Sequence, residues 1–526
     1  MTDANPTGPP VIAGQVSESA PPAAESRTKT AGPMVVEVTN AASRGSAKEP
    51  LAGRRTVTID PVTRIEGHAR VFLDLADDGS LISAGLVVNE LRGFERILVG
   101  MEADRMPLIT ARICGVCPSA HHLAASKAIE AAAGVTPPPA AKLLRELLYM
   151  GHYIHSHSLS LFVLQGPDLI LGLDADPAIR NVVGVVEAAP EVAKKALRLR
   201  TLGQKINEMV GGRGVHPVTS LAGGIAFRLD EEKKRILTDW VEEALALGPE
   251  LIGVARDKLL QQVEAHPELL RDWVVPAWNM GTVNDGKASL YDGTLRVMDE
   301  VGTVRDEFQA ADYDRHLVES VLDWSYMKPV HYRETGSGEE RLYRVGALAR
   351  INCVDSMGTP VADQLLAGFR RDFGRPAHQV VLHAYARIIE LIYAVERARE
   401  ILADPRIDGE TRAEVRFTGG RGVAHVEAPR GTLIHDYRID ERGIITSANL
   451  IVATQQNYAC INQSITQAAM SHVIGRADDG LLNAIEFAIR CYDPCLSCAT
   501  HALGQMPLEV LVRQAGQPVR SVRREV

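Results

Sequence analysis

The sequence has no surplus of basic residues and no apolar run long enough to cross a membrane. Its 57 Lys and Arg residues face 66 Asp and Glu residues, which leaves a formal net charge of −9. Nucleic acid is therefore not an expected partner, because its phosphates need a basic surface. A membrane-spanning helix needs about 20 apolar residues in a row, so none is expected. The N-terminus lacks the pattern of a secretory signal, and the expected compartment is the cytoplasm.

Cysteine is scarce, and nucleotide-binding glycine motifs are missing. Seven cysteines among 526 residues are too few for a disulfide scaffold. The chain has no Gly-x-Gly-x-x-Gly fingerprint, so it is not expected to bind a dinucleotide itself. Four of the seven cysteines stand in two Cys-x-x-Cys pairs. We expect the other three, Cys353, Cys460 and Cys491, to be small buried side chains.

The composition divides the chain into a tail and one large body. Residues 1–52 are rich in Pro, Ala, Ser, Gly and Thr, which predicts a disordered tail. Alternating apolar residues predict a strand at 56–60 and a hairpin from 69–75 and 81–88. A second β segment is expected at 413–452, with a turn at 440–443. The predicted class is mainly α with small antiparallel β segments (α+β).

Helical periodicity dominates between the two β segments. Leucines at 143, 144, 147 and 148 recur at the spacing of one helix face. Pro376 is expected to open a long helix, with charged residues on the face opposite its apolar stripe. We assign to that charged face Arg387, Glu390, Arg397 and Glu400.

The two cysteine pairs are the main chemical signal. Cys114 and Cys117 form one pair, and Cys495 and Cys498 form the other. Two residues between the cysteines of a pair let both sulfurs turn toward one point. We therefore predict that the four thiolates meet in the fold and bind one buried metal centre.

The residues alone leave the metal open. Thiolates are soft ligands that suit zinc, an iron–sulfur cluster or another late transition metal. A zinc ribbon spaces its pairs by roughly 15–20 residues, whereas residues 118–494 separate these two pairs. A site that only the whole fold can close is more often functional than structural. A redox-active Cys-x-x-Cys is expected in a βαβ unit, and neither pair has that context.

The flanks of the pairs carry a family resemblance. The first pair lies in Arg112-Ile-Cys-Gly-Val-Cys-Pro-Ser-Ala-His121 and the second in Asp493-Pro-Cys-Leu-Ser-Cys-Ala-Thr-His501. Together these motifs resemble the large subunit of nickel–iron hydrogenases. Residues 60–68, 92–95 and 427–431 fit the same pattern in order. The resemblance covers about residues 55–510 and implies that family's fold as a single catalytic domain over residues 53–501.

The resemblance implies a role for each sulfur. In this family four thiolates hold nickel, and an iron carrying cyanide and carbon monoxide shares two of them. By matching position, Cys117 and Cys498 would bridge nickel and iron, and Cys114 and Cys495 would bind nickel alone. Such a centre splits hydrogen heterolytically into protons and electrons. Cys495 is then the expected first proton acceptor.

Residues outside the pairs are expected to complete the centre. Arg430, after Pro429, would lie above the open coordination site and donate to a cyanide ligand. Thr454 would donate to the second cyanide. Asp493 would lie near Arg430 and balance its charge.

A proton exit and a second metal are implied as well. Glu66 would carry protons away from the site; without the resemblance, an ion pair with Arg64 would be its simplest role. Magnesium would bind Glu95, His501 and the carbonyl of Leu450, with water completing an octahedral shell.

One position departs from the family pattern. Many members carry His-Asp-His where this chain has His155, Ser156 and His157. The missing carboxylate should weaken the acidic surroundings of Arg430, and it indicates the soluble, multimeric, NAD(P)-linked or related branch. His121 is expected to support the first cysteine pair from outside the ligand shell.

The end of the chain predicts maturation. His501 usually ends the mature subunit in this family, so residues 502–526 are expected to be a peptide that an endopeptidase removes after nickel insertion. A retained tail can hold the second cysteine pair open until the metal arrives. An ordinary C-terminal extension is the alternative.

The predicted function is the catalytic subunit of a soluble nickel–iron hydrogenase. The chain lacks cysteines for further clusters, so a small subunit with iron–sulfur clusters is required near the first cysteine motif. Flavin-containing diaphorase subunits would pass the electrons to NAD(P). The alternatives are an uptake hydrogenase with a membrane-linked or quinone acceptor, a complex I subunit that has lost the metal, and a structural zinc protein.

Overall fold

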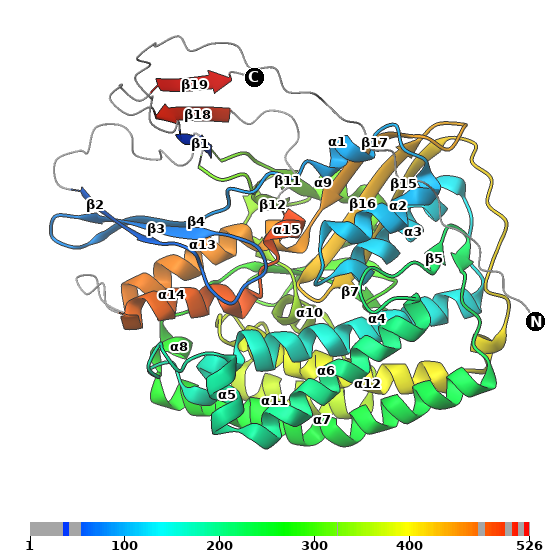
Figure 1. Ribbon diagram of the computed structural model, residues 1–526, viewed down its shortest axis with the longest axis horizontal. Coiled ribbons are helices and arrows are strands. Elements are labelled where there is room, and N and C mark those ends of the chain that lie inside the picture. Colours follow the sequence, from blue (N-terminus) through cyan, green and yellow to red (C-terminus); the bar gives the residue numbers. More distant parts are fainter. Residues whose placement is uncertain are drawn as a thin grey trace, which may run out of the picture.

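Long helices and several small sheets pack into one body around a continuous apolar core (Figure 1). The computed structural model describes residues 35–40, 54–322, 324–471, 479–499, 508–513 and 520–524. Helices α4, α6, α7 and α12 run side by side across the lower half of Figure 1, and the β15–β17 sheet lies above them. The predicted class, mainly α with small sheets in a single domain, is confirmed.

Helices make up most of the body. Their bounds are α1 Phe94–Leu98, α2 Met106–Thr110, α3 Pro118–Ala133, α4 Pro139–Leu159, α5 Val182–Ala188, α6 Pro190–Gly211, α7 Glu231–Ala265, α8 Glu268–Arg271, α9 Tyr313–His316, α10 Ala347–Cys353, α11 Pro360–Phe373, α12 Leu382–Ala403, α13 Ala453–Ser471, α14 Asp479–Tyr492 and α15 Leu496–Ala499. Short 3-10 or π turns are η2 Ala103–Arg105, η3 Ala111–Ile113, η4 Ser160–Leu164, η5 Pro167–Leu171, η6 Ala310–Asp312 and η7 Pro405–Asp408.

The strands form small sheets that are almost entirely antiparallel. Two of these sheets match the predicted β segments. The first consists of β2 Arg54–Ile59, β3 Arg70–Ala76 and β4 Leu81–Val87, and the second of β15 Gly420–Ala428, β16 Gly431–Ile439 and β17 Ile445–Ile451. The others are β5 Ser220–Leu221, β6 Gly224–Ile225, β7 Trp278–Asn284, β8 Lys287–Ala288, β9 Thr294–Met298, β10 Val304–Phe308, β11 Leu317–Glu319, β12 Val330–Arg333, β13 Glu340–Arg341 and β14 Tyr343–Arg344. The pairing of β14 with β7 is parallel.

Strands β5 to β14 lie where the sequence predicted mainly helices. Most of them are only two to five residues long. Alternation over so few residues gives little periodic signal, because a strand needs several residues to reveal its two faces. They leave the class unchanged and form three further sheets.

A further strand lies in the N-terminal segment that was predicted to be disordered. Strand β1 (Val35–Asn40) pairs with β18 (Leu508–Arg513), which pairs in turn with β19 (Arg520–Arg524). The prediction for residues 1–52 therefore does not hold at Val35–Asn40. The rest of that segment up to residue 52 lies outside the described residues.

Helix α12 differs from its prediction at its start and on its charged face. It begins at Leu382 rather than at Pro376, because the preceding residues bond instead to the segment at 273–275. Arg387 and Glu390, which were assigned to the charged face opposite the apolar stripe, are both buried. Since α12 contacts α4, α7, α10 and α11, little of it reaches water.

Helices α4 and α6 cross where each has a glycine. A Cβ on Gly203 would lie 2.6 Å from the carbonyl oxygen of Gly151 and 2.6 Å from the backbone nitrogen of His155. Both atoms belong to the backbone, so no side-chain rotation can relieve the contact. The glycine at 203 therefore sets how closely the two helices approach.

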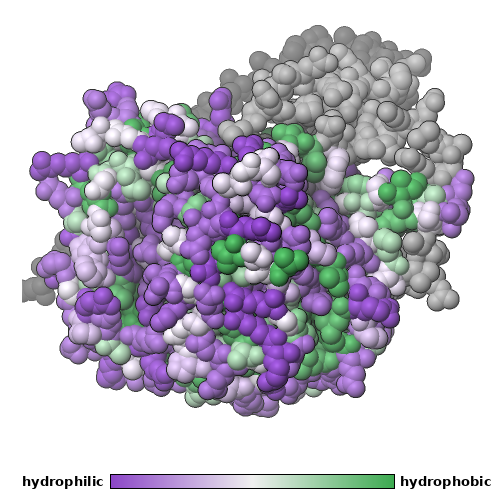
Figure 2. Space-filling model, turned by 180° about the vertical axis from the view of Figure 1, so that it is seen from behind, coloured by the Kyte–Doolittle hydropathy of each residue, from purple (hydrophilic) through white to green (hydrophobic). Residues whose placement is uncertain are grey.

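The outer surface is mainly polar. Figure 2 shows one face covered largely by hydrophilic side chains, with separate apolar areas between them. Within the part of the chain that the structure describes, each helix is too short or too polar to traverse a bilayer.

Gly203→Ala tests the packing of the two helices. The substitution should lower the free energy of unfolding by about 1–3 kcal/mol, because the added methyl group overpacks the crossing. Gly253→Ala in α7 is the matched control, since no atom lies within 4 Å of the added Cβ; its better helix propensity should stabilise by roughly 0.5–1 kcal/mol. Thermal unfolding of both proteins measures the difference. Equal midpoints would refute the role of the crossing.

Candidate metal centre

The first cysteine pair lies in the loop that leads into helix α3. Cys114 has extended backbone angles directly after η3, and Cys117 caps the N-terminus of α3. Pro118 occupies the first helical position, where a missing N–H costs nothing. The backbone N–H of Val116 donates to the Cys114 sulfur at 3.2 Å. The loop thus fixes both sulfurs at one end of a buried helix.

The second pair follows helix α14. Asp493 adopts a left-handed backbone conformation (φ +53°), which turns the chain sharply before Cys495. The short helix α15 then carries Cys498. The Thr454 hydroxyl accepts a hydrogen bond from the Cys495 backbone N–H at 2.9 Å. The turn, the helix and this bond direct both sulfurs inward.

A third segment holds the second pair in place. Glu66 forms a parallel β-bridge with Cys495, and its carbonyl accepts from the Leu496 N–H at 3.1 Å. Gly67 has φ +82°, and a Cβ there would lie 2.8 Å from Leu496 Cβ. A glycine is therefore required for the two segments to approach this closely.

All four sulfurs meet at one buried point, as predicted. The sulfur of Cys495 lies 3.2 Å from that of Cys114, 3.8 Å from that of Cys117 and 2.9 Å from that of Cys498. The sulfurs of Cys117 and Cys498 are 3.1 Å apart. All lie within 4.8 Å of one another, and each residue is at most 4% exposed. Among the described residues this is the one group of ligand side chains with metal-binding geometry.

The sulfur chemistry fits a soft metal. Burial raises the pKa of the Cys495 and Cys498 thiols well above the ordinary value. The pKa of Cys114 is held well below that value, because neighbouring thiols donate to its sulfur. All four can ionise together only when a cation is bound among them. The donor set is that of a late transition metal.

Arg430 and Asp493 form a buried ion pair beside the sulfurs. The Arg430 guanidinium donates through Nε to the Asp493 carbonyl at 2.8 Å and through Nη2 to its Oδ1 at 3.0 Å. The predicted proximity of these two residues is confirmed. Arg430 Nη1 and Asp493 Oδ2 are buried and have no hydrogen-bond partner among the described residues. Such orphaned atoms fit a polar group held in the site.

A small cavity joins Arg430 to the sulfurs. Its lining is Cys117, His121, Ala428, Arg430, Leu433, Val452, Ala453, Thr454, Cys495 and Cys498. Pro429, predicted beside Arg430, is buried within the same turn. The Thr454 hydroxyl oxygen accepts a hydrogen bond from the Cys495 backbone N–H. Its own proton is therefore free to be donated to a group in the cavity. Besides the sulfurs and the polar side chains of His121, Arg430 and Thr454, the walls are apolar.

Glu66 lies beside the second pair. Its carboxylate accepts from the Ser497 N–H at 3.0 Å and is half-buried. The ion pair with Arg64 that would have been its simplest role does not form among the described residues. Arg64 pairs with Asp168 instead, at 2.7 Å. Glu66 therefore lies against the segment that carries the second cysteine pair and is partly open to solvent.

His121 lies against the sulfur of Cys498, and its predicted support of the first cysteine pair stays a prediction. Its Nε2 lies 3.4 Å from the Cys498 sulfur, because α3 turns the histidine toward α15. Its Nδ1 lies 3.1 Å from His435 Nε2, and His435 Nδ1 lies 2.7 Å from the Tyr437 hydroxyl. No motif in the sequence pointed to these last two residues.

The predicted magnesium ligands are placed only in part. Glu95 is buried in α1, which packs against β17, the strand that contains Leu450. His501 lies outside the described residues. The structure therefore brings two of the three residues to neighbouring elements.

The His155-Ser156-His157 segment is buried in α4. Ser156 Oγ has no hydrogen-bond partner among the described residues, and Asp493 is the carboxylate that pairs with Arg430. His157 Nε2 lies 2.9 Å from Glu390 Oε2. Burial lowers the pKa of His157 even though Glu390 opposes this, which favours a neutral ring.

The three remaining cysteines are buried away from the cluster, as predicted. Burial raises the pKa of Cys353 and Cys491 to about 12 and that of Cys460 to about 11. They are protonated thiols at neutral pH and behave as small apolar side chains.

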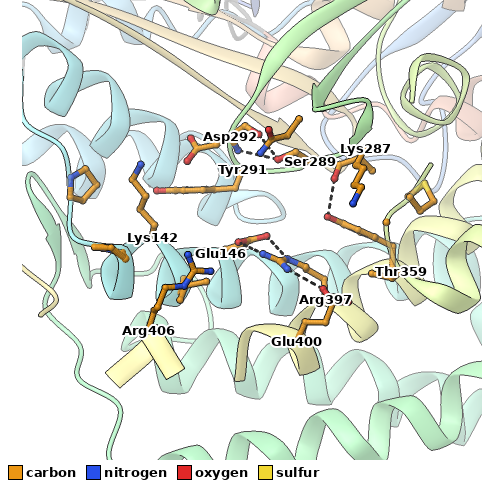
Figure 3. A pocket seen from close by; sticks show the side chains of 18 of the residues that line it. Lys142, Glu146, Lys287, Ser289, Tyr291, Asp292, Thr359, Arg397, Glu400 and Arg406 are labelled. Carbon is orange, nitrogen blue, oxygen red and sulfur yellow. Dashed lines mark hydrogen bonds and ion pairs between the residues drawn. The ribbon is translucent and has the colours of Figure 1, made fainter. Parts of the chain in front are cut away.

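A larger cavity lies elsewhere in the fold (Figure 3). It measures about 720 Å³, and its lining includes Lys142, Glu146, Tyr291, Arg397 and Glu400. Arg397 donates to Glu146 at 2.8 Å and to Glu400 at 3.0 Å, so these charges are already matched. None of the predicted site residues lines it.

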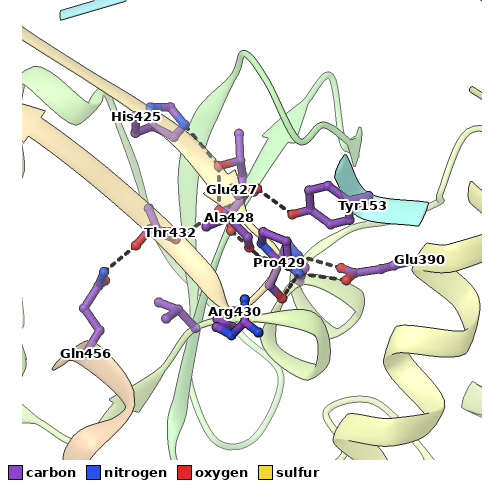
Figure 4. A network of polar contacts seen from close by, with 12 residues as sticks. Tyr153, Glu390, His425, Glu427, Ala428, Pro429, Arg430, Thr432 and Gln456 are labelled. Atoms are coloured by element: carbon purple, nitrogen blue, oxygen red, sulfur yellow. Dashed lines mark hydrogen bonds and ion pairs between the residues drawn. The ribbon is translucent and has the colours of Figure 1, made fainter. Parts of the chain in front are cut away.

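A buried polar network that no sequence motif indicates lies behind Arg430 (Figure 4). Arg350 on α10 binds Glu390 on α12 and Glu427 on β15. Glu427 belongs to the matched 427–431 segment, which was the one signal that could have found it. Glu390 had been assigned to the charged face of its helix, and no pattern singled out Arg350.

Comparisons with known proteins agree with this site. A family described as nickel-dependent hydrogenase matches residues 92–191 and 284–501, and one described as HoxL-like matches residues 56–91. The NAD-reducing hydrogenase HoxS subunit beta of Cupriavidus necator is 40% identical over 482 residues, which is 88% of this chain and 98% of that protein.

Two further relatives point the same way. The vhu-type F420-non-reducing hydrogenase chain of Methanococcus voltae is 44% identical over 417 residues, which is 78% of this chain and 98% of that protein. A crystal structure of NAD+-reducing NiFe-hydrogenase in the H2-reduced state superposes with a TM-score of 0.81 at 38% identity, covering 85% of this chain and 100% of that one. The chain therefore belongs to the nickel-dependent hydrogenase family, as a catalytic large subunit with a four-cysteine nickel–iron site.

Proposed function

We propose that this chain cleaves H2 heterolytically and reversibly, and that its four thiolates hold a nickel–iron group with cyanide and carbon monoxide ligands. The meeting of four buried sulfurs beside the orphaned Arg430 Nη1 carries the proposal. When bound, the metal group would supply the Lewis acidity and redox capacity that the reaction needs. Cys114, Cys117, Cys495 and Cys498 would together hold this group.

The polar side chains of the cavity would orient the group. Arg430 Nη1 is a buried, permanently charged donor with no protein partner among the described residues. Thr454 offers a second donor on the cavity wall. Asp493 holds the guanidinium in place and balances its charge. We therefore assign one cyanide to Arg430 and the other to Thr454.

Protons would leave through Cys495 and Glu66. Glu66 lies beside Cys495 in a β-bridge, and its carboxylate bonds to the backbone of the loop that carries both sulfurs. A half-buried carboxylate at this position can accept a proton from inside and release it outward. Magnesium would bind at Glu95, Leu450 and His501.

Electrons would leave through a small subunit with iron–sulfur clusters. Leu91, Ile97 and Val99 are exposed apolar residues around α1, and Arg92 ties this region to Ile113, next to the first motif. We place the small-subunit interface there. We propose NAD(P) as the final acceptor, through a diaphorase module in the cytoplasm, because the Cupriavidus necator relative is NAD-reducing. Another acceptor is the second candidate, since the Methanococcus voltae relative is F420-non-reducing.

Metal analysis of the mature complex tests the centre. The purified protein should contain nickel and iron, and its infrared spectrum should show cyanide and carbonyl bands. Cys495→Ala should lower the nickel content at least about tenfold and abolish hydrogen uptake. Cys460→Ala removes a buried thiol away from the cluster and should leave both unchanged. Zinc without nickel and iron would refute the proposal and favour a structural zinc site.

Glu66→Gln tests the proton exit. The amide keeps the shape of the side chain but cannot carry a proton, so hydrogen oxidation should fall by about 100-fold or more. Nickel content and infrared bands should remain those of the wild type. Glu90→Gln, at a carboxylate that pairs with His68, is the control and should retain full activity. Wild-type rates in Glu66→Gln would contradict the assignment.

We propose that residues 502–526 are removed after His501 once the metal is bound. The peptide contains strands β18 and β19, and β18 pairs with β1 in the full chain. Intact-mass measurement should give a subunit that ends at His501 when nickel is supplied. The full-length chain should accumulate under nickel starvation. Full-length protein in the active complex would contradict the proposal.

A further inference from the structure

Arg350 makes hydrogen bonds with every donor that its side chain possesses. Its Nε donates to Glu390 Oε1 at 2.5 Å and its Nη2 to Glu390 Oε2 at 2.7 Å. Its Nη1 donates to Glu427 Oε2 at 3.0 Å. The two remaining N–H groups bind carbonyl oxygens, of Ala428 at 3.0 Å and of Pro429 at 3.1 Å. A guanidinium has five such donors, and all five are used.

These carbonyls belong to the turn that carries Arg430. Strands β15 and β16 are joined directly at this point, with Ala428 paired to Gly431. Pro429 and Arg430 are the two residues between them. Arg350 therefore binds the backbone of the two residues that precede Arg430.

Two carboxylates hold Arg350 itself. Burial disfavours its charge, but Glu390 and Glu427 more than offset that effect, and its pKa stays well above the ordinary value. Burial alone would raise the pKa of Glu390, whereas Arg350 brings it down to about 2. Thr282 and Thr432 donate to the other oxygen of Glu427, at 2.7 and 2.9 Å. Arg350, Glu390 and Glu427 together form a clamp, in which the two ion pairs keep the guanidinium charged despite its burial.

The other side of the turn is also tied down. The hydroxyls of Tyr149 and Tyr153 donate to the Glu427 carbonyl. Asn457 Nδ2 donates to the Arg430 carbonyl at 3.3 Å. Each backbone carbonyl from Glu427 to Arg430 therefore has a side-chain donor. These bonds hold the backbone from which the Arg430 side chain, with its unpartnered Nη1, projects.

We propose that Arg350 is a positioning residue for hydrogen cleavage, which fixes the 427–430 turn so that Arg430 Nη1 meets the diatomic ligands of the metal group. The inference rests on the proposed function of Arg430. Arg350 itself does not line the cavity and touches no reacting atom. Its effect is on direction, because a hydrogen bond weakens steeply when donor and acceptor are misaligned.

Arg350→Lys tests the clamp in the nickel-loaded complex. Lysine keeps the charge but has at most three donors from one atom, so it cannot hold two carboxylates and two carbonyls together. The cyanide stretching bands should shift, and kcat for hydrogen oxidation should fall on the order of 10- to 100-fold, since misplacing a catalytic group has costs of this size. The KM for hydrogen should change little.

Arg145→Lys is the matched control. Arg145 is also fully buried, binds Glu130 with both Nη atoms and donates to the carbonyls of Leu221 and Gly224. It lies on α4, away from the cavity lining. Both variants should lose thermal stability, and only Arg350→Lys should move the cyanide bands. If the bands and kcat of Arg350→Lys match those of Arg145→Lys, the inference is overturned.

Arg430→Lys separates this inference from the function on which it rests. If Arg430→Lys leaves the cyanide bands unchanged, the proposed contact of Arg430 fails and the inference falls with it. If Arg430→Lys shifts them and Arg350→Lys does not, only the clamp is refuted. If Arg350→Lys does not take up nickel, Glu390→Gln is measured instead. It keeps the shape of the clamp with weaker bonds and should give a smaller shift; unchanged bands would overturn the inference.

Discussion

The meeting of two distant cysteine pairs at one point is the constraint on which the rest of the structure depends. The first pair is set by the loop that enters α3, and the second by the turn between α14 and α15. Neither segment closes the site alone. Glu66 ties the second pair to the N-terminal sheet through a β-bridge, and Gly67 permits the close approach. The ends and the middle of the chain must therefore all be folded before four sulfurs can face one metal.

The second constraint is the matching of charge in a dry interior. Three guanidiniums, of Arg350, Arg387 and Arg430, lie among three carboxylates, of Glu390, Glu427 and Asp493. An unmatched charge at this depth would cost several kcal/mol. Arg350 pairs with Glu390 and Glu427, Arg430 pairs with Asp493, and Arg387 donates to the carbonyl oxygen of Cys491.

The cavity wall shows how little polarity the site needs. Most of its lining besides the sulfurs is apolar, and the orphaned donor of Arg430 and the hydroxyl of Thr454 stand out against it. In a medium of low polarity each such hydrogen bond is stronger than in water. The direction of these few hydrogen bonds then matters more than their number. This explains why so many side chains hold the backbone behind Arg430. The buried charges of Arg350, Glu390 and Glu427 therefore orient Arg430 and take no part in the reaction themselves.

The sequence by itself determined the four sulfurs, the residues around them and the family. Each of these depends on short motifs, in which metal binding dictates the spacing of the ligands. It also determined the N-terminal hairpin, the 440–443 turn and the helix that contains Leu143 to Leu148, whose patterns are local. The tertiary structure decided the rest. Only the fold turns His121 toward Cys498, buries Glu390 on the charged face of α12 and brings Arg350 to the Arg430 turn. These contacts join residues far apart in the chain, and no local pattern encodes which distant partner a buried polar side chain will meet.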